Sequence, residues 1–504
     1  MIAALLLAAA AASQGRLVVL VVVDQLRYQD VLWLSPMLGP RGFAGLGRAA
    51  PMRYETAVTE TASGHAVLST GAYADVNGIV GNSFWQGARY QEAVEDSACP
   101  VWGAKAGRSA AALRAPTIGD MLKLNTGGAA RVVGIAVKDR SALFLVGPSA
   151  DLALWWEADI GEMASTACYA PGPPGWLPHR PAEAFKDWVW TLSQPDAIAR
   201  LLPQPRAAGA RPAADLGPEF PHTVGRGKLD DRLYRAIRNT PAGTTVALRA
   251  ARAAVAAFKL GEAGRTDLLT VALASVDTVG HQYGALSRER VDAVLRVHDE
   301  LSAFLDELRK RLGPRLSIVL SSDHGLTPTE AEEQRLRVQG GTAATDDLIP
   351  RLNRALDEAL GARAGGWVAG IEGNWLALRA PFPARAIDVA VEFLRREPGL
   401  FRVVPASEVA GMEPFIRHSW FPGRSGQVLL VVRPLWTLKP RDVGANHGSA
   451  WNDDALVPLM VEAAEFRLRG DAQFRATQVA PTIAALLETA PPSAALDTAA
   501  IEHR

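Results

Sequence analysis

The hydrophobic pattern of the chain alternates short, continuously apolar runs with longer stretches of helical periodicity. The apolar runs are typical of strands buried on both faces of a parallel sheet, and they lie at 17–23, 131–137, 268–274, 316–320 and 457–461. The helical stretches lie at 244–260, 288–312 and 479–487. This alternation predicts an α/β fold with a doubly wound, mostly parallel central sheet and helices on both faces.

Two stretches interrupt this pattern, and we expect both to be segments inserted into one catalytic core. Residues 151–225 are crowded with Trp and Pro and lack clear periodicity, which predicts an irregular cap. Its aromatic side chains can stack on a substrate, although packing within an irregular segment is the commoner use. Residues 326–440 alternate short strands and helices and form the second insertion. The core then consists of 13–150, 226–325 and 441–504, and 491–504 is expected to be a loose tail.

The N-terminal segment has the composition of a signal peptide. Residues 1–12 are nearly all Ala, Leu and Ile, and small residues follow at a site that signal peptidase can cut. No Lys or Arg precedes the apolar run, so a slightly apolar N-terminal tail is the alternative. We expect export, to the periplasm or beyond the cell. The run is shorter than the ~20 residues of a membrane-spanning helix, and no later stretch is long enough, so no membrane span is expected.

Composition limits the classes of partner. The chain has 504 residues, 48% of them hydrophobic and 21% charged, which allows a large buried core. Lys and Arg together number 53, as do Asp and Glu, so no overall charge favours nucleic acid and no nucleic-acid binding is expected. The two cysteines, Cys99 and Cys168, fit no CxxC metal pattern, and in an exported protein they can form one disulfide.

Acidic residues and histidines follow the apolar runs directly. The carboxyl ends of parallel strands are where open α/β sheets bind their ligands. Asp277 and His281 are four residues apart, so a helical turn would place both on one face, where they can share a metal ion. Each of these residues alone is as well explained by a turn or a helix cap. The complete set is Asp24, Asp277, His281, Asp323, His324 and, in a later loop of small residues, His447.

A candidate nucleophile lies at the predicted start of a helix, in the stretch TETASGHAVLSTG at 59–71. Gly64 permits a tight turn, and Thr61 would lie beside free backbone N–H groups, which favour an anion such as phosphate. A threonine hydroxyl is a weak nucleophile unless a base or a metal activates it. Ser63 is the other nearby hydroxyl.

Three further side chains are candidates for binding a phosphoryl group. Asn82 ends a turn-rich segment and can donate its amide to an oxyanion. Lys138 and Arg140 follow the run at 131–137, and on an extended backbone they would point the same way and grip one phosphoryl group. A turn residue and a solvated charge pair are the more ordinary interpretations of these residues.

Together the motifs resemble the alkaline phosphatase superfamily. More narrowly, they resemble its threonine-nucleophile alkaline phosphatases of the PafA type, which are related to the type I phosphodiesterases and nucleotide pyrophosphatases. The resemblance covers nearly the whole chain after the N-terminal segment. It is carried by VVVDQLRY, TETASGHAVLSTG, GIVGN, VKDR, SVDTVGHQYG, SSDHG and NHGS.

The resemblance implies a site with two Zn²⁺ ions per chain. One ion would be held by Asp277, His281 and His447. The other would be held by Asp24, Asp323 and His324, with Thr61 as its exchangeable ligand. The TxxGH motif makes Thr61 the nucleophile and not Ser63, and it implies a covalent phosphothreonine. Asn82, Lys138 and Arg140 would stabilise the non-bridging oxygens.

The expected function is hydrolysis of small-molecule phosphate monoesters, because two cations suit a phosphoryl dianion better than a diester. A phosphodiesterase or nucleotide pyrophosphatase using the same site is the alternative. A sulfatase is disfavoured, since the Cys/Ser-x-Pro-x-Arg stretch is missing around Thr61. A binding protein on a degenerate phosphatase scaffold is disfavoured because every nucleophile and ligand position holds a competent residue.

Overall fold

The structure is a computed structural model, and it describes residues 15–504 except 87–88, 207–208, 214, 263 and 442. Residues 1–12, where we expect a signal peptide, lie outside the described part. As expected, none of the described helices has the length and apolar character needed to span a membrane.

A nine-stranded sheet lies at the centre, in the order β22-β2-β20-β13-β1-β12-β7-β8-β9. Its five consecutive parallel strands are β13 (Leu316–Ser321), β1 (Arg16–Val23), β12 (Thr266–Leu273), β7 (Val132–Ala136) and β8 (Leu152–Glu157). Antiparallel pairing begins at the flanks with β20 (Leu456–Glu462) and β9 (Glu162–Ala164), and β2 (Ala50–Arg53) and β22 (Phe474–Arg475) form the far edge. The predicted mostly parallel sheet is confirmed.

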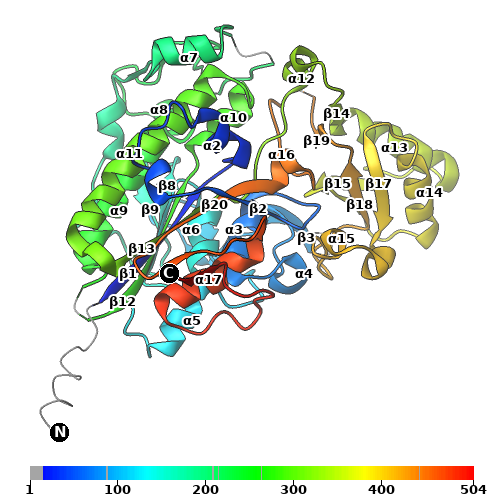
Figure 1. Cartoon of the computed structure of the whole chain (residues 1–504). Coiled ribbons are helices and arrows are strands. Elements are labelled where there is room, and N and C mark those ends of the chain that lie inside the picture. Colours follow the sequence, from blue (N-terminus) through cyan, green and yellow to red (C-terminus); the bar gives the residue numbers. More distant parts are fainter. Residues whose placement is uncertain (1–14, 87–88, 207–208, 214, 263, 442) are drawn as a thin grey trace, which may run out of the picture.

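Helices cover both faces of this sheet (Figure 1). On β1, Leu17, Val19 and Val21 belong to one hydrophobic cluster, whereas Val18 and Leu20 belong to another, because successive side chains point to opposite faces. The first cluster includes residues of α9 (Ala242–Phe258), α10 (Ser275–Tyr283) and α11 (Arg288–Leu312). The second includes residues of α3 (Thr61–Thr70), α5 (Ile118–Asn125), α6 (Asp139–Val146) and α17 (Val479–Leu487).

Shorter elements join these layers and lie mainly before β7. They are α2 (Tyr28–Leu34), α4 (Ala74–Asn77), the hairpin of β3 (Ser83–Gln86) and β4 (Arg89–Glu92), the pair β5 (Glu95–Pro100) and β6 (Gly107–Arg108), and, near the C-terminus, α16 (Asn452–Ala455).

The irregular cap starts later than the expected boundary at residue 151. β8 and β9 are strands of the central sheet, and Trp155 and Trp156 are buried in the core. The sheet therefore continues to Ala164. Beyond it lie α7 (Pro195–Leu201), α8 (Asp231–Arg238) and the small pair of β10 (Val189–Trp190) with β11 (His222–Thr223).

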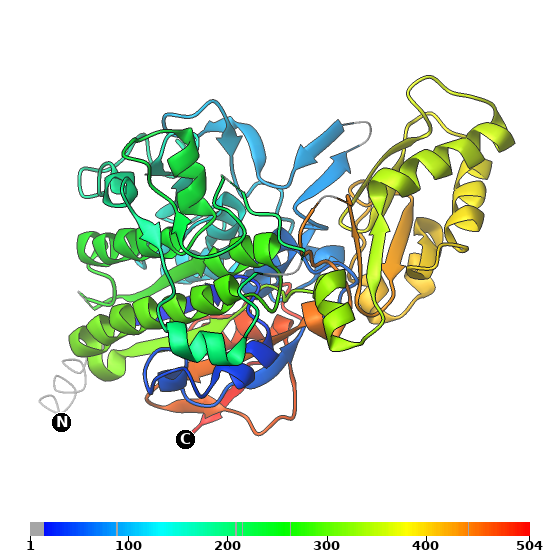
Figure 2. The ribbon, with the colours of Figure 1, turned by 90° about the horizontal axis from the view of Figure 1, so that it is seen from above.

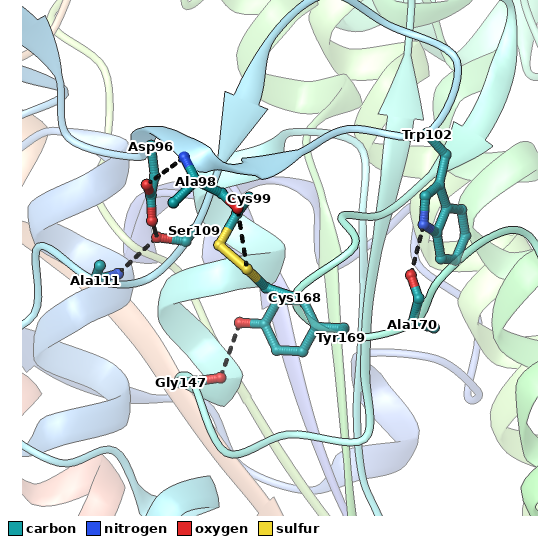
Figure 3. Close-up of a disulfide and its surroundings, with 10 residues drawn as sticks. All are labelled: Asp96, Ala98, Cys99, Trp102, Ser109, Ala111, Gly147, Cys168, Tyr169 and Ala170. Atoms are coloured by element: carbon teal, nitrogen blue, oxygen red, sulfur yellow. Dashed lines mark hydrogen bonds between the residues drawn. A yellow bond between two sulfur atoms is a disulfide. The ribbon is translucent and has the colours of Figure 1, made fainter.

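A disulfide between Cys99 and Cys168 ties the end of β5 to the start of this cap (Figure 3). The two Cα atoms are 5.3 Å apart. Beside it, Trp102 Nε1 donates to the carbonyl of Ala170, and the Tyr169 hydroxyl donates to the carbonyl of Gly147. The disulfide that the two cysteines allow is therefore present.

The second insertion folds around a core of its own and forms a lobe beside the main sheet in both views (Figures 1 and 2). Its antiparallel sheet has the order β15-β16-β18-β17. The Asn374 side chain in the β15–β16 turn donates to the carbonyls of Ala57, at 3.0 Å, and Gly448, at 2.6 Å. The elements are α12 (Glu330–Leu336), β14 (Gly341–Ala344), α13 (Thr345–Leu360), β15 (Val368–Glu372), β16 (Trp375–Leu378), α14 (Ala384–Leu394), β17 (Leu400–Pro405), α15 (Pro414–Arg417), β18 (Val428–Val432) and β19 (Trp436–Lys439).

The C-terminal segment is not the loose tail expected from its composition. β23 (Ile501–His503) pairs antiparallel with β21 (Phe466–Leu468), and the backbone N–H of Leu496 donates to the carbonyl of Gly71 at the end of α3. The backbone of this segment is thus hydrogen-bonded to the core, a long-range contact that composition does not reveal.

Candidate active site

Three aspartates meet at the carboxyl edge of the central sheet. Asp24 follows β1, Asp277 lies in the first turn of α10 just after β12, and Asp323 follows β13. The register aligns these strand ends, with Val23 opposite Leu273 and Val22 opposite Ser321. All three carboxylates are buried. The sequence-based placement of these acids at one sheet edge therefore agrees with the structure.

Thr61 is the first residue of α3, and its hydroxyl points at this cluster. Its Oγ1 lies 3.4 Å from His324 Nε2 and 3.2 Å from Lys138 Nζ, which donates to it. The close approach depends on Gly64, because a Cβ there would lie 2.4 Å from the backbone oxygen of Asp323. Gly64 thus allows α3 to pack against the end of β13.

The histidines are oriented by backbone carbonyls. The Nδ1 atoms of His281, His324 and His447 face the carbonyl oxygens of Ala445, Gly325 and Thr59 at 2.8, 2.9 and 2.7 Å. Since a carbonyl only accepts, each Nδ1 is the donor, and in the neutral imidazole each Nε2 then keeps a free lone pair. This arrangement is usual for metal-binding histidines.

The free Nε2 atoms face the buried carboxylates. His281 Nε2 is 3.2 Å and His447 Nε2 3.8 Å from Asp277 Oδ1, and His324 Nε2 is 3.4 Å from both Asp24 and Asp323. The His324 and His447 rings stack with centroids 3.6 Å apart. Burial, together with His324 and His281, lowers the pKa of His447 well below its ordinary value, so its imidazole is neutral.

Several carboxylate oxygens in this cluster lack a donor. Neither oxygen of Asp24 accepts a hydrogen bond from any described residue, although Lys138 Nζ lies 2.7 Å from Oδ2, and Asp323 Oδ2 also lacks a hydrogen bond. Burying a carboxylate without a donor is costly unless a cation compensates it. Burial, with Asp277 and Asp323 beside it, raises the pKa of Asp24 well above its ordinary value. The donor set therefore fits divalent metal ions with oxygen and nitrogen ligands.

Two groups of residues have donor atoms close enough to hold one ion each. One is Asp277, His324 and His447, and the other is Asp24, Asp323 and His324. The sequence-based division placed His281, not His324, with Asp277 and His447. His281 lies beside Asp277 all the same, so the structure brings all six expected Asp and His ligands together, with His324 between the two groups.

The extended backbone expected from Lys138 to Arg140 ends at Lys138. Lys138 is the extended residue just before α6, and Arg140 lies in the first turn of this helix. The Lys138 ammonium contacts Asp24 at 2.7 Å and Asp277 at 2.5 Å. It therefore lies at the carboxylate cluster, beside Thr61. The Arg140 guanidinium forms a long ion pair of 3.8 Å with Asp139. Its buried Nε has no hydrogen-bond partner among described residues. Both side chains still line one cavity of about 280 Å³, together with Asn82.

The Asn82 side chain binds a backbone N–H at the N-terminus of α3, where we expected the N–H groups to face an anion directly. Its Oδ1 accepts the N–H of Ala62 at 2.9 Å, which leaves its amide N–H groups to act as donors. Its own backbone N–H donates to Glu60 Oε2 at 2.6 Å. Burial raises the pKa of Glu60 to about 7, against the hydrogen bond from Asn82.

Sequence reasoning missed two residues that position this site. Glu60 fixes the backbone of Asn82 by accepting its N–H. The sequence feature that indicates such a role is the position of Glu60 just before α3. His65 lies one turn after Thr61, and its Nδ1 is 2.7 Å from the Thr61 carbonyl and 3.2 Å from Asp323 Oδ2. Their partners lie far away in sequence or on the backbone, so motif spacing does not show these roles.

Comparison with known proteins shows the family to which this chain belongs. Residues 18–450 match the type I phosphodiesterase / nucleotide pyrophosphatase family, and the chain belongs to it. The alkaline phosphatase PhoK of a Sphingomonas species is 29% identical over 90% of this chain and 84% of its own length. A protein of Myroides odoratus named calcium-transporting ATPase is 28% identical over 96% of this chain and 94% of its own length.

A solved structure confirms the fold. The crystal structure of the wild-type alkaline phosphatase PafA superposes with a TM-score of 0.89 at 24% identity, covering 96% of this chain and 98% of that one. The chain thus has the alkaline-phosphatase-like α/β fold, and the comparisons support a phosphate-ester hydrolase.

Proposed function

We propose that the protein is a metal-dependent alkaline phosphatase that hydrolyses phosphate monoesters through a covalent phosphothreonine at Thr61. One observation carries this proposal. The Thr61 hydroxyl lies within 3.4 Å of both His324 Nε2 and Lys138 Nζ, at the edge where the buried carboxylates meet. Family membership and the named alkaline phosphatase relative support the reaction class.

The residues fit two zinc ions. Asp277, His281 and His447 would hold one, and Asp24, Asp323 and His324 the other, with Thr61 as a further ligand; His324 is near enough to serve either ion. When bound, the ions would lower the pKa of the Thr61 hydroxyl and neutralise charge on the leaving oxygen. The oxygens of Asp24 and Asp323 that accept no hydrogen bond from a described residue support this assignment.

The side chains of this chain then carry the reaction. Thr61 Oγ1 attacks phosphorus, the bond to the ester oxygen breaks, and the proton of the Thr61 hydroxyl passes to that oxygen, which leaves as the alcohol. Water next attacks the phosphothreonine and releases phosphate, so that Thr61 regains its proton. The Asn82 amide and the Arg140 guanidinium donate to the non-bridging oxygens, and the Lys138 ammonium holds the Thr61 oxygen in place and adds positive charge.

A phosphodiesterase or nucleotide pyrophosphatase is the second candidate, because the matching family carries that description. The Arg140 guanidinium, whose Nε has no hydrogen-bond partner among the described residues, favours the monoesterase, since a monoester dianion offers it an extra charged oxygen.

The test compares kcat/KM of the zinc-loaded enzyme for an aryl phosphate monoester and its methyl diester. We expect a strong preference for the monoester. Arg140→Ala should lower the monoester value about 100-fold and the diester value much less, because the lost interaction is with the extra charge. A preference of the wild type for the diester would move the protein to the phosphodiesterase branch.

Export is part of the proposal. The N-terminal segment has the composition of a signal peptide, and the Cys99–Cys168 disulfide is a bond that persists in oxidising compartments. We therefore place the enzyme in the periplasm or outside the cell.

A further inference from the structure

The cavity beside the proposed phosphoryl-binding residues is also lined by Arg238, a cationic side chain that the proposed mechanism does not use. Arg238, the last residue of α8, lines the same cavity of about 280 Å³ as Asn82, Lys138 and Arg140. A cavity of this size holds a small ester rather than a polymer. An organic group that occupies this cavity therefore has Arg238 on its wall.

The backbone around Arg238 is held in place from two sides. On one side, Trp156 Nε1, from β8, donates to the carbonyl of Tyr234 at 3.0 Å. On the other, Gln282 of α10 donates to the carbonyl of Asn239 at 3.0 Å. Since α10 also carries Asp277 and His281, the end of α8 is fixed relative to the expected metal ligands.

The hydrogen bond between Ser275 and Thr240 strengthens this link. Ser275 Oγ donates to the carbonyl of Thr240 at 3.1 Å. Thr240 lies two residues after Arg238, and Ser275 lies two residues before Asp277. Arg238 therefore starts from a rigid part of the cavity wall, as a side chain that selects a ligand must.

Two other charged groups of the cavity wall already have partners. Arg108 contacts Asp139 at 3.0 Å and Glu92 at 2.8 Å. Glu157 accepts from Trp155 Nε1 at 3.2 Å and from a backbone N–H. By contrast, the half-buried Arg238 side chain has neither a hydrogen bond nor an ion pair with any residue that the structure describes.

We propose that Arg238 binds a second anionic group on the substrate, a carboxylate or a second phosphate. The preferred substrates are then small phosphate monoesters whose alcohol part is itself anionic. This inference rests on the proposed phosphatase function and names the substrate class of that same site. Arg140 binds the transferred phosphoryl group, and Arg238 the anion at the other end of the ester.

The test measures kcat/KM for phenyl phosphate, 4-carboxyphenyl phosphate and 1,4-phenylene bisphosphate. The enzymes are the wild type, Arg238→Gln and the control Arg235→Gln, which removes the same charge from an exposed position of α8. Arg238→Gln should lower the values for the two charged esters about tenfold, mainly through KM. Phenyl phosphate should change less than about twofold, as should all three esters in Arg235→Gln. The two charged esters also separate carboxylate from phosphate recognition.

Three results would overturn the inference. An equal loss on all three esters would mean that Arg238 acts on the phosphoryl group or on the fold. No loss on either charged ester would show that it does not contact the second anion. A wild-type preference for phosphocholine over the charged esters would assign the cavity to a cation, bound by the exposed Asp159.

A binding measurement keeps this inference separate from the proposed function. Calorimetry with 4-carboxyphenylphosphonate and phenylphosphonate needs no turnover. The carboxylate should improve binding about tenfold in the wild type and not in Arg238→Gln. If the wild type does not hydrolyse phenyl phosphate, the proposed function fails, but this comparison still decides the role of Arg238.

Discussion

The side-chain oxygen of Asn82 accepts a hydrogen bond of 2.9 Å from the backbone N–H of Ala62, the residue that follows Thr61. This bond fixes which way the amide points, because an oxygen that accepts from the helix leaves the N–H₂ group on the other side. In the proposed function, the α3 N-terminus therefore acts on the substrate through Asn82. The proposed nucleophile, Thr61, and this proposed donor are then held by neighbouring residues of one helix turn.

Asn82→Ala should remove an oriented donor from the developing negative charge. We expect kcat/KM for an aryl phosphate to fall by about 10² to 10³, the usual effect of losing one such donor. Zinc content measured by atomic absorption should not change, since Asn82 is not a ligand. Asn125→Ala, at an exposed position where the amide bonds Thr489, is the control and should keep full activity. Full activity in Asn82→Ala would contradict the assignment.

The disulfide predicts a stability difference. Cys99 and Cys168 are separated by 69 residues, and closing a loop of that length in the unfolded chain stabilises the fold by about 2 to 4 kcal/mol. The double variant Cys99→Ala/Cys168→Ala should lose this amount in chemical denaturation. Reduced wild type should match the variant. Equal stability of oxidised wild type and variant would show that the bond constrains nothing.

Asp454 predicts a pH dependence of stability. Burial raises its pKa to about 7 from an ordinary value of 3.8, while its carboxylate accepts from Ser449 N and Thr327 Oγ1. The folded state therefore binds this proton more tightly than the unfolded state, so the free energy of unfolding falls as pH rises between about 4 and 7.

Asp454→Asn removes that titration. We expect the Tm of wild type minus that of the variant, measured on metal-free protein, to decrease by a few degrees from pH 5 to pH 8. A difference that stays constant over this range would mean that Asp454 ionises normally in the folded protein.

The acids of the site could be predicted from sequence because their positions follow from the sheet alone. Buried parallel runs end at one edge, so Asp24, Asp277 and Asp323 had to meet if the runs were adjacent strands. The four-residue spacing of Asp277 and His281 correctly predicted that both lie on one face of a helix, which is α10.

Long-range contacts were beyond the sequence pattern. Lys138 lies between β7 and α6, and its ammonium contacts carboxylates that follow β1 and lie on α10, which no alternation rule indicates. Glu60 positions the site because it accepts a hydrogen bond from the backbone N–H of Asn82, which is far from it in the sequence. Likewise, β8 has the sequence LALWWE, whose Trp pair resembled the aromatic cap more than a sheet strand.

The most direct test of the central claim is the covalent intermediate. Enzyme mixed with an aryl phosphate is quenched in acid within one turnover, and the peptide that contains both Thr61 and Ser63 is sequenced by mass spectrometry. Ser63 is the rival nucleophile, and its hydroxyl donates to the Glu60 carbonyl at 3.1 Å within the helix cap. We predict phosphate on Thr61 in wild type and in Ser63→Ala, and neither phosphopeptide nor turnover in Thr61→Ala. Phosphate on Ser63, or turnover retained by Thr61→Ala, would contradict the account.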